Sequence, residues 1–292
     1  MKIFLLGADG QLGHELGGAL GCCAEVVPAT EADFDMTDPD ALRRALASAS
    51  PDVVVNAAAY TDVDGAERAP EAAMRVNADA VRVLGEEARR ARQLLVHYST
   101  DFVFDGRKAT AYVEEDPPAP LGAYGRSKLR GEQALAELGA PAIVLRTAWL
   151  YSLRRKSFVS QMLKLARERT SLRVVADQVG SPTFCRDLAQ ATALLLHGLR
   201  GASAEAVGAA HGVYHLAGDG ACSRYELAKA AIELDPRRAE HQLRELEPIP
   251  SEAYPLPAAR PKHAPLDCGK AQRRFGIRLP PWRESLARAL AG

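Results

Sequence analysis

A tyrosine and a lysine one helical turn apart are the residues best suited to chemistry in this sequence of 292 residues. Tyr124 and Lys128 stand four positions apart, and residues at that spacing share one face of a helix. A phenol has an ordinary pKa of about 10, and a nearby ammonium group lowers this pKa because it favours the phenolate. The pair therefore predicts a general acid or base that is tuned by its neighbour.

A threonine is expected to join this pair. Residues 94–98 form an apolar run typical of a buried strand, and Ser99 and Thr100 follow it. Ligands bind at the carboxyl edge of parallel α/β sheets. We therefore expect the Thr100 hydroxyl to lie in the same cleft as Tyr124 and Lys128.

The sequence of residues 7–13, GADGQLG, predicts a dinucleotide-binding turn. Glycines between a strand and a helix let the backbone approach a pyrophosphate at the helix N-terminus. The spacing is GxxGxxG rather than GxGxxG, and a tight turn without a ligand is the alternative.

The choice between NAD and NADP is left open by the residues after the second predicted strand. Glu31, Asp33 and Asp35 all stand near the position at which an acidic residue binds the ribose of NAD. No arginine follows that strand directly to hold a 2′-phosphate, and Arg43 and Arg44 come later, on a predicted helix.

Short apolar strands alternate with helices along the first half of the chain. Strands are expected at 3–6, 26–27, 53–55, 94–98 and 143–145, and helices at 11–20, 38–47, 70–91 and 124–138. Alternation of this kind indicates parallel βαβ units with helices on both faces of the sheet. The predicted fold class is α/β, a Rossmann-type doubly wound parallel sheet with a smaller C-terminal α/β substrate-binding lobe.

The second half is less regular and predicts that smaller lobe. Helices are expected at 158–169, 187–199, 223–233 and 282–291, and strands at 172–175 and 213–216. We assign residues 1–150 to a dinucleotide-binding Rossmann domain and residues 151–292 mainly to the substrate lobe. Some later segments, such as 172–175, are expected to return to the first sheet.

Composition excludes several classes of protein. Lys plus Arg and Asp plus Glu both number 37, so no strongly basic nucleic-acid surface is expected. No apolar run approaches 18 residues, which argues against a membrane helix, and the first apolar run is too short for a signal peptide. The five cysteines have irregular spacing, which indicates reduced thiols in a cytoplasmic protein rather than a disulfide framework.

Together these residues resemble the extended short-chain dehydrogenase/reductase superfamily. Longer stretches resemble the dTDP-4-dehydrorhamnose reductase family in particular. The matching stretches are residues 55–61, 97–106, 120–128, 146–151, 177–183 and 254–261. They occur in order along nearly the whole chain, which makes the resemblance more specific than any one of them.

The resemblance implies reduction of the 4-keto group of dTDP-4-dehydro-β-L-rhamnose to give dTDP-L-rhamnose, with NADPH as cofactor and NADH as the alternative. It implies that Tyr124 protonates the new alkoxide oxygen and that Lys128 lowers the tyrosine pKa and binds the nicotinamide ribose. Thr100 is implied to bind the reacting oxygen.

The resemblance also implies binding residues. Gly7, Gly10, Gln11, Leu12 and Gly13 would hold the pyrophosphate, Asp35 and Met36 the adenosine, while Ala59, Tyr60, Thr61 and Tyr98 would line the cofactor cleft together with Tyr124 and Lys128. Asp101, Trp149 and Arg260 would meet the sugar nucleotide beside Thr100, with Arg260 on the diphosphate because its planar fork suits paired oxygens. Core packing for Trp149 and a surface ion pair for Arg260 are the alternatives.

The residues after Thr100 help to distinguish a reductase from related enzymes. Sugar-nucleotide dehydratases carry two acidic residues there, whereas this chain has Asp101 followed by Phe102, which argues against dehydration. A reductase or epimerase acting on another nucleotide sugar, and a non-catalytic cofactor-binding regulatory subunit, are the remaining alternatives.

No metal is expected. Some members of the family join a dimer through magnesium held by acidic residues, and one of these positions is Arg186 here. A cation repels a metal, and Glu15 cannot hold one alone. We therefore expect a monomer or a homodimer without a metal bridge, with a nucleotide sugar as partner and with neither nucleic acid nor membrane.

Overall fold

A six-stranded parallel sheet forms the centre of the computed structural model, which describes residues 1–292 except for the side chain of residue 204. Its strands lie in the order β10-β5-β4-β3-β1-β2. They are β1 (Lys2–Leu6), β2 (Glu25–Ala29), β3 (Val53–Asn56), β4 (Leu94–Thr100), β5 (Ala142–Thr147) and β10 (Gly212–His215). Along β1, Ile3 and Leu5 enter one core while Phe4 and Leu6 enter the other. Burial on both faces explains why the strands are continuous apolar runs.

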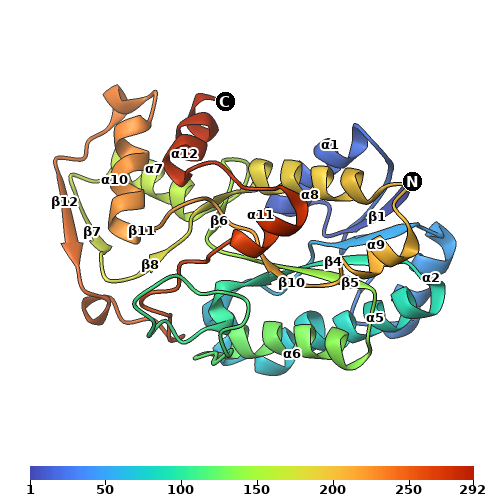
Figure 1. The fold of residues 1–292 in the computed structure, drawn as a ribbon. Coiled ribbons are helices and arrows are strands. Elements are labelled where there is room, and N and C mark those ends of the chain that lie inside the picture. The colour runs from blue at the N-terminus through green and yellow to red at the C-terminus, as the bar shows by residue number, and fades with distance from the viewer.

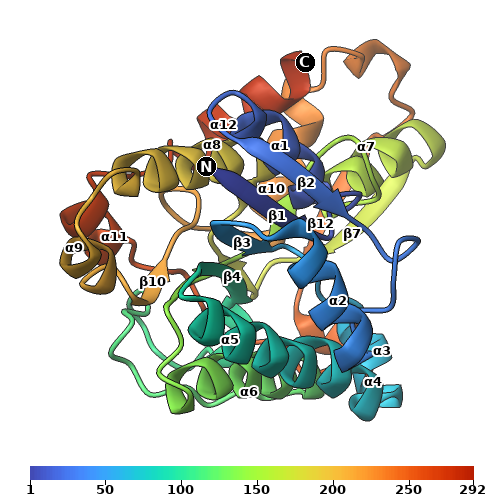
Figure 2. The ribbon, with the colours of Figure 1, turned by 90° about the vertical axis from the view of Figure 1, so that its right-hand side faces the viewer.

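Helices cover both faces of this sheet (Figure 1, Figure 2). One face carries α1 (Gln11–Gly21) and α8 (Cys185–Leu199), which pack against each other. The opposite face carries α2 (Pro39–Ala49), α5 (Ala80–Ala91) and α6 (Ala123–Glu137). The predicted doubly wound fold class is thus confirmed.

A second lobe lies at one end of the sheet, at the left of Figure 1. Its helices are α7 (Phe158–Glu168), α10 (Arg224–Leu234) and α12 (Trp282–Ala291). Three small sheets accompany them: β6 (Leu150–Tyr151) with β9 (Thr183–Phe184), β8 (Val179–Gly180) with β11 (Cys222–Ser223), and β7 (Ser171–Val175) with β12 (Glu245–Ile249). Tyr151, Val159, Leu227 and Leu286 contribute to its core.

Residues 172–175 do not return to the main sheet as expected. They belong to β7, whose parallel partner is β12. The later strand that does return is β10, which pairs with β5. The division of the chain at residue 150 stays a prediction.

The predicted helix 70–91 contains a π-helical turn. It consists of α4 (Pro70–Met74), the π-helical turn Arg75–Asp79, and α5. Within this turn Asn77 accepts a hydrogen bond from the Tyr60 amide (2.9 Å) and donates to the Tyr60 carbonyl (3.1 Å) and to Ser127 Oγ (2.9 Å). These bonds fix the segment after β3, and π-turns inside helices frequently mark functional sites.

The remaining helices are short, and no described helix is long and apolar enough to cross a membrane. They are α3 (Val63–Arg68), α9 (Ala204–Gly208) and α11 (Gly269–Phe275). Two predicted helix starts are confirmed: Asp38 caps α2 by accepting from two backbone amides, and Ser223 and Glu226 form the capping box of α10.

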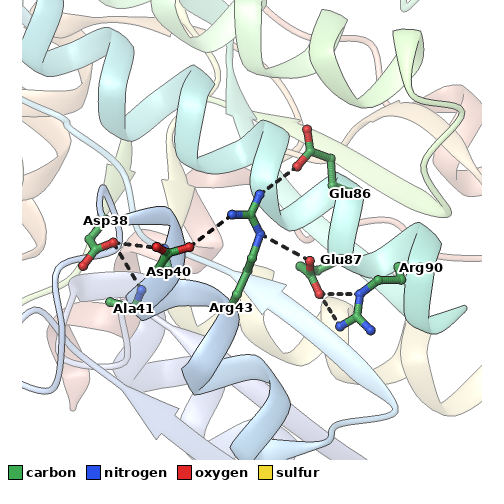
Figure 3. A network of polar contacts seen from close by, with 7 residues as sticks. All are labelled: Asp38, Asp40, Ala41, Arg43, Glu86, Glu87 and Arg90. Carbon is green, nitrogen blue, oxygen red and sulfur yellow. Dashed lines mark hydrogen bonds and ion pairs between the residues drawn. The ribbon is translucent and has the colours of Figure 1, made fainter.

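An ion-pair network joins α2 to α5 on the surface (Figure 3). Arg43 on α2 lies 3.2 Å from the carboxylate of Glu86 and 3.5 Å from that of Glu87, both on α5. Glu87 is in turn paired with Arg90. These contacts engage the Arg43 guanidinium with carboxylates of α5.

A buried ion pair connects α6 to the sheet. Arg146 on β5 donates to both carboxylate oxygens of Glu132 on α6, at 2.6 and 3.0 Å, and both side chains are about 5% exposed or less. Ser99 on β4 donates to the same carboxylate. A buried pair of this kind strongly destabilises the fold once one partner is removed.

We expect Arg146→Met to lower the free energy of unfolding by roughly 3–5 kcal/mol, because the Glu132 carboxylate is left buried and unpaired. Arg130→Met is the matched control, since it removes an exposed pair with Glu137 on the same helix and should cost less than about 1 kcal/mol. Urea unfolding curves of both variants test this. Equal losses would show that burial of the Arg146 pair has no special weight.

Candidate active site

A cleft of about 1050 Å³ opens at the carboxyl edge of the main sheet. The glycine turn, the segments after β2, β3 and β4, the start of α6 and parts of the second lobe line it. The predicted residues in this lining are Gly7, Gly10, Gln11, Leu12, Asp35, Met36, Ala59, Tyr60, Thr61, Thr100, Asp101, Tyr124, Trp149 and Arg260. Of the described residues that we predicted for the site, Gly13, Tyr98 and Lys128 are outside it.

The glycine turn has no room for side chains. Gly7 has a φ of +73°, and a Cβ there would stand 2.7 Å from the Ala58 amide nitrogen. A Cβ on Gly13 would stand 1.9 Å from the Gly7 carbonyl oxygen. Gly10 is the N-cap of α1 and gives its first turn no side-chain hydrogen bond, and Gly10, Gln11 and Leu12 line the cleft. This bare backbone fits a dinucleotide pyrophosphate.

The carboxylates after β2 are engaged in local turns. Asp35 accepts hydrogen bonds from the Thr37 amide and hydroxyl, each at 2.8 Å, and these bonds lower the pKa of its carboxyl group. Asp33 accepts from the Thr30 amide and hydroxyl in the same way. Asp35 and Met36 line the cleft, as an adenosine site requires.

Thr100 and Tyr124 meet at the floor of the cleft because α6 starts against the segment after β4. A Cβ on Gly125 would stand 2.2 Å from the Phe102 carbonyl oxygen, so only glycine permits this approach. The Phe102 ring meets the Tyr124 ring edge-on at 5.5 Å. Burial raises the pKa of Tyr124 to about 12, and the neighbouring Thr100 hydroxyl opposes this rise.

Lys128 is buried under the strand rather than pointed at the phenol. Its Nζ donates to the Tyr98 carbonyl oxygen (2.7 Å) and lies 3.3 Å from His97 Nε2. Burial lowers the pKa of Lys128 to about 8. Burial dominates the pKa of Tyr124, and the neighbouring charge of Asp101 raises it further. The lowering of this pKa by Lys128 stays a prediction.

Tyr98, which we predict at the cofactor cleft, has its side chain directed elsewhere. Its hydroxyl lies 2.7 Å from Thr192 Oγ1 on α8, and its ring packs in the core. Alternation along β4 points this side chain away from α6. Tyr98 contributes its carbonyl oxygen, which accepts from Lys128.

Asp101 is a buried carboxyl group with one free oxygen. It is 2% exposed, its Oδ1 accepts from the Thr100 hydroxyl at 3.1 Å, and its Oδ2 has no partner among the described residues. Burial raises the pKa of Asp101 to about 7, while the Thr100 hydroxyl and the positive charge of Arg224 oppose this rise.

The second lobe contributes Trp149, Arg224 and Arg260 to the cleft. Trp149 has a φ of +45°, which is strained for a bulky residue, and its ring packs on Gly180, where a Cβ would stand 2.6 Å away. Arg224 stacks over this ring at 3.5 Å. Arg260 is paired with Asp64 on α3, at 2.8 and 3.1 Å.

Three residues of this site were not predicted from the sequence. Asn77 orients Tyr60, His97 contacts Lys128, and Arg224 stacks on Trp149. A polar residue in the middle of an amphipathic helix is the one signal that Asn77 gives. His97 and Arg224 give none, because their roles arise from contacts between distant segments.

Arg186 and Glu15 contact each other instead of a metal. Arg186 Nε lies 3.3 Å from Glu15 Oε2. Among the described residues no group of three or more His, Cys, Asp or Glu side chains is placed to hold a metal ion. The absence of a metal bridge stays a prediction.

Comparisons with known proteins cover the whole chain. The family model described as the RmlD substrate binding domain matches residues 1–292. A dTDP-4-dehydrorhamnose reductase of Burkholderia thailandensis is 45% identical over 288 residues, 97% of this chain and 96% of that protein. A probable dTDP-4,6-dihydroxy-2-methyloxan-3-one 4-ketoreductase of Streptomyces antibioticus is 39% identical, covering 99% and 94%. The crystal structure of a dTDP-4-dehydrorhamnose reductase from Bacillus anthracis in complex with NADP has a TM-score of 0.90 and 32% identity, covering 99% and 98%.

We expect Gly13→Ala to weaken NADPH binding roughly tenfold or more, equivalent to about 1.4 kcal/mol, because the turn must deform. Gly18→Ala is the matched control on the same helix: nothing lies within 4 Å of its Cβ position, and it should stabilise α1 by up to about 1 kcal/mol. Fluorescence titration with NADPH measures the cofactor affinity of both variants. Unchanged affinity in Gly13→Ala would make the turn purely structural.

The raised pKa of Asp101 predicts a pH-dependent stability. A carboxyl group with a higher pKa in the folded chain destabilises the fold as the pH rises from its unfolded to its folded pKa, here from 3.8 to about 7. Asp101→Asn removes this effect. Its free energy of unfolding relative to wild type should therefore increase between pH 4 and pH 8, by at most about 4 kcal/mol.

Asp105→Asn provides the opposite control. A hydrogen bond from Tyr112 lowers the pKa of Asp105, so this variant should lose stability relative to wild type as the pH rises. Urea unfolding at several pH values compares the two. A pH-independent difference for Asp101→Asn would contradict the raised pKa.

Proposed function

The chain belongs to the RmlD family, and on this premise we propose that it is a nicotinamide-dependent dTDP-4-dehydrorhamnose reductase. It would reduce the 4-keto group of dTDP-4-dehydro-β-L-rhamnose and release dTDP-L-rhamnose. The observation that carries this proposal is the meeting of Thr100 and Tyr124 on the floor of a cleft that begins at the bare glycine turn.

The cofactor site is assigned by fit. The glycine turn would hold the pyrophosphate, Asp35 and Met36 the adenosine, and Ala59, Tyr60 and Thr61 the middle of the cleft. When bound, the nicotinamide supplies the hydride that reduces the carbonyl carbon. Asn77 has a supporting part, because it holds both main-chain polar groups of Tyr60 in place.

Tyr124 acts as the general acid. With its pKa raised to about 12, the phenol keeps its proton at neutral pH and gives it to the alkoxide oxygen as that oxygen becomes basic. Thr100 has a single O–H, which donates to Asp101 Oδ1 in this structure. With substrate bound, this O–H would turn to the same oxygen and so help to fix the carbonyl for reaction. Phe102, packed against Tyr124, occupies the position where a second carboxylate would be needed for dehydration.

Lys128 is the residue of this group that would position the cofactor. An ammonium group has three donors, and one of them is anchored on the Tyr98 carbonyl oxygen. A second lies beside His97 Nε2, and the remaining donor would reach the nicotinamide ribose. We therefore assign Lys128 to cofactor positioning, with its influence on Tyr124 exerted once the ribose lies between them.

NADPH is the cofactor that we propose, with NADH as the alternative. The support comes from the relative at 32% identity, whose crystal structure contains NADP. The carboxylates after β2 favour neither clearly, because Asp33 and Asp35 are engaged by Thr30 and Thr37. The ratio of kcat/KM for the two cofactors measures the preference.

A 4-ketoreductase acting on a different dTDP sugar is the second candidate. The Streptomyces antibioticus relative, at 39% identity, is named for such a reaction. A panel of keto sugar nucleotides, assayed by NADPH and NADH oxidation, distinguishes the candidates. Turnover of dTDP-4-dehydro-β-L-rhamnose at least as efficient as that of the other sugars is expected, and no sugar-dependent oxidation would contradict both candidates and leave the regulatory alternative.

The surface residues Arg186 and Glu15 and the cysteines bear on assembly and location. We propose a monomer or a homodimer without a metal bridge, because Arg186 occupies Glu15. The free cysteines support a cytoplasmic place of action.

We expect Tyr124→Phe to lower kcat roughly 10²-fold or more, because the proton donor is lost while the ring keeps its packing. The KM for NADPH should change little. Tyr151→Phe is the matched control: that buried hydroxyl has no partner among the described residues, and its removal should leave kcat unchanged. Stopped-flow NADPH oxidation measures both, and wild-type turnover by Tyr124→Phe would refute the role of the phenol.

A further inference from the structure

The guanidinium of Arg224 is held in the cleft by aromatic rings rather than by an acid. It stacks over the Trp149 ring at 3.5 Å and lies 5.1 Å from the centre of the Phe158 ring. Arg224 is the first residue of α10 and lines the cleft. Stacking of this kind fixes a planar cation while leaving its N–H edge free to donate.

Three arginines line the cleft, and the other two are already paired. Arg155 lies 3.0 Å from Asp9, and Arg260 uses both terminal nitrogens on Asp64. Among the described residues no carboxylate lies within 4.0 Å of the Arg224 guanidinium. Arg224 is thus the cleft arginine whose donors are not committed to an acidic side chain.

The surroundings of Arg224 favour an anionic ligand. Burial lowers the pKa of Arg224 to about 10, so the group is charged at neutral pH although its location is costly for a charge. The N-terminal end of α10 adds positive potential at the same place. A ligand that brings negative charge and paired oxygens would offset this cost.

We propose that Arg224 binds the diphosphate of the nucleotide-sugar substrate, at the phosphate next to the sugar. This inference rests on the proposed function and specifies how that substrate is held. Arg224 is close enough to Asp101 for each charge to affect the other, and Asp101 is bonded to Thr100. The phosphate of such a sugar is attached across the ring from the reacting ketone, so a sugar placed at Thr100 points its phosphate toward the second lobe.

Arg260, which we expected on the diphosphate, has a different part in this arrangement. Its ion pair with Asp64, together with the bond from the Ala258 amide to the same carboxylate, ties residues 258–260 to α3. Three of its five N–H donors are used on Asp64 and on the Ala258 carbonyl oxygen. Arg224 therefore offers the more open set of donors to the diphosphate, and a direct contact of Arg260 with the same group stays a prediction.

Calorimetric titration of the full chain with dTDP and, by displacement, with thymidine tests the proposal. Arg224→Gln should weaken dTDP binding roughly 10- to 100-fold, as expected for a charged hydrogen-bond donor, and leave thymidine binding unchanged. Arg224→Lys should recover part of the loss, because a point charge lacks the fork. Lys229→Gln, on the exposed side of the same helix, is the matched control and should bind dTDP like wild type.

Several results would overturn the proposal. They are dTDP affinity within twofold of wild type in Arg224→Gln, an equal loss for dTDP and thymidine, or a large loss in Arg260→Gln with none in Arg224→Gln. An equal loss would mean that Arg224 supports the base or the Trp149 ring instead. A folded Arg224→Lys variant, checked by its melting temperature, keeps the test valid if Arg224→Gln fails to fold.

The test separates this proposal from the proposed function. Absence of dTDP binding in the wild-type chain would overturn the role of Arg224. A chain that binds dTDP through Arg224 but turns over no keto sugar nucleotide would overturn only the proposed reaction.

Discussion

The site depends on how closely α6 approaches β4. Tyr124, Lys128 and Glu132 are spaced by four residues, so they lie along one face of α6, and each contacts one of the last three residues of β4. Tyr124 adjoins Thr100, Lys128 donates to the Tyr98 carbonyl oxygen, and Glu132 accepts from Ser99. Gly125 makes this approach possible because no larger residue clears the Phe102 carbonyl oxygen. Catalytic geometry and fold stability therefore rest on the same helix face.

The charged side chains near the contact between α6 and β4 fall into two groups. Glu132 and Arg146, below the site, form a buried ion pair that ties the helix to β5, although Arg146 Nη1 has no partner among the described residues. Asp101 and Arg224, in the cleft, have polar atoms not committed to an ion pair among the described residues. Unpaired buried charge costs free energy, so its presence beside an open cleft is explained by a ligand that completes it. The fold thus pairs opposite charges between α6 and β5, and it leaves charged groups without an ion-pair partner beside the cleft.

Features encoded by neighbouring residues could be predicted from the sequence, whereas features that depend on contacts between distant segments could not. The glycine turn, the Asp38 cap and the capping box at Ser223 are encoded within a few residues, and the structure contains each of them. The helical spacing of Tyr124 and Lys128 and the place of Thr100 after a strand indicated these residues, and the family resemblance supplied their roles, but neither could supply their orientation. Tyr98 faces α8 instead of the cleft because of strand alternation, and Lys128 is anchored on a carbonyl oxygen. Arg224 could not be predicted from the sequence, because it stacks on Trp149, which stands 75 positions earlier in the chain.

Two late segments complete the cleft, one held by hydrogen bonds and an ion pair and the other by packing on an aromatic ring. Residues 258–260 are tied to α3 by the carboxylate of Asp64, so the proline-rich stretch that contains them is fixed to the first lobe by polar bonds. Arg224 instead stacks on the strained Trp149, whose ring packs against Gly180. Strain at a bulky residue persists only where the surroundings hold it, and here the Arg224 guanidinium and Gly180 contact the Trp149 ring. The conformation of Trp149 and the position of the Arg224 cation in the cleft therefore depend on the same packing.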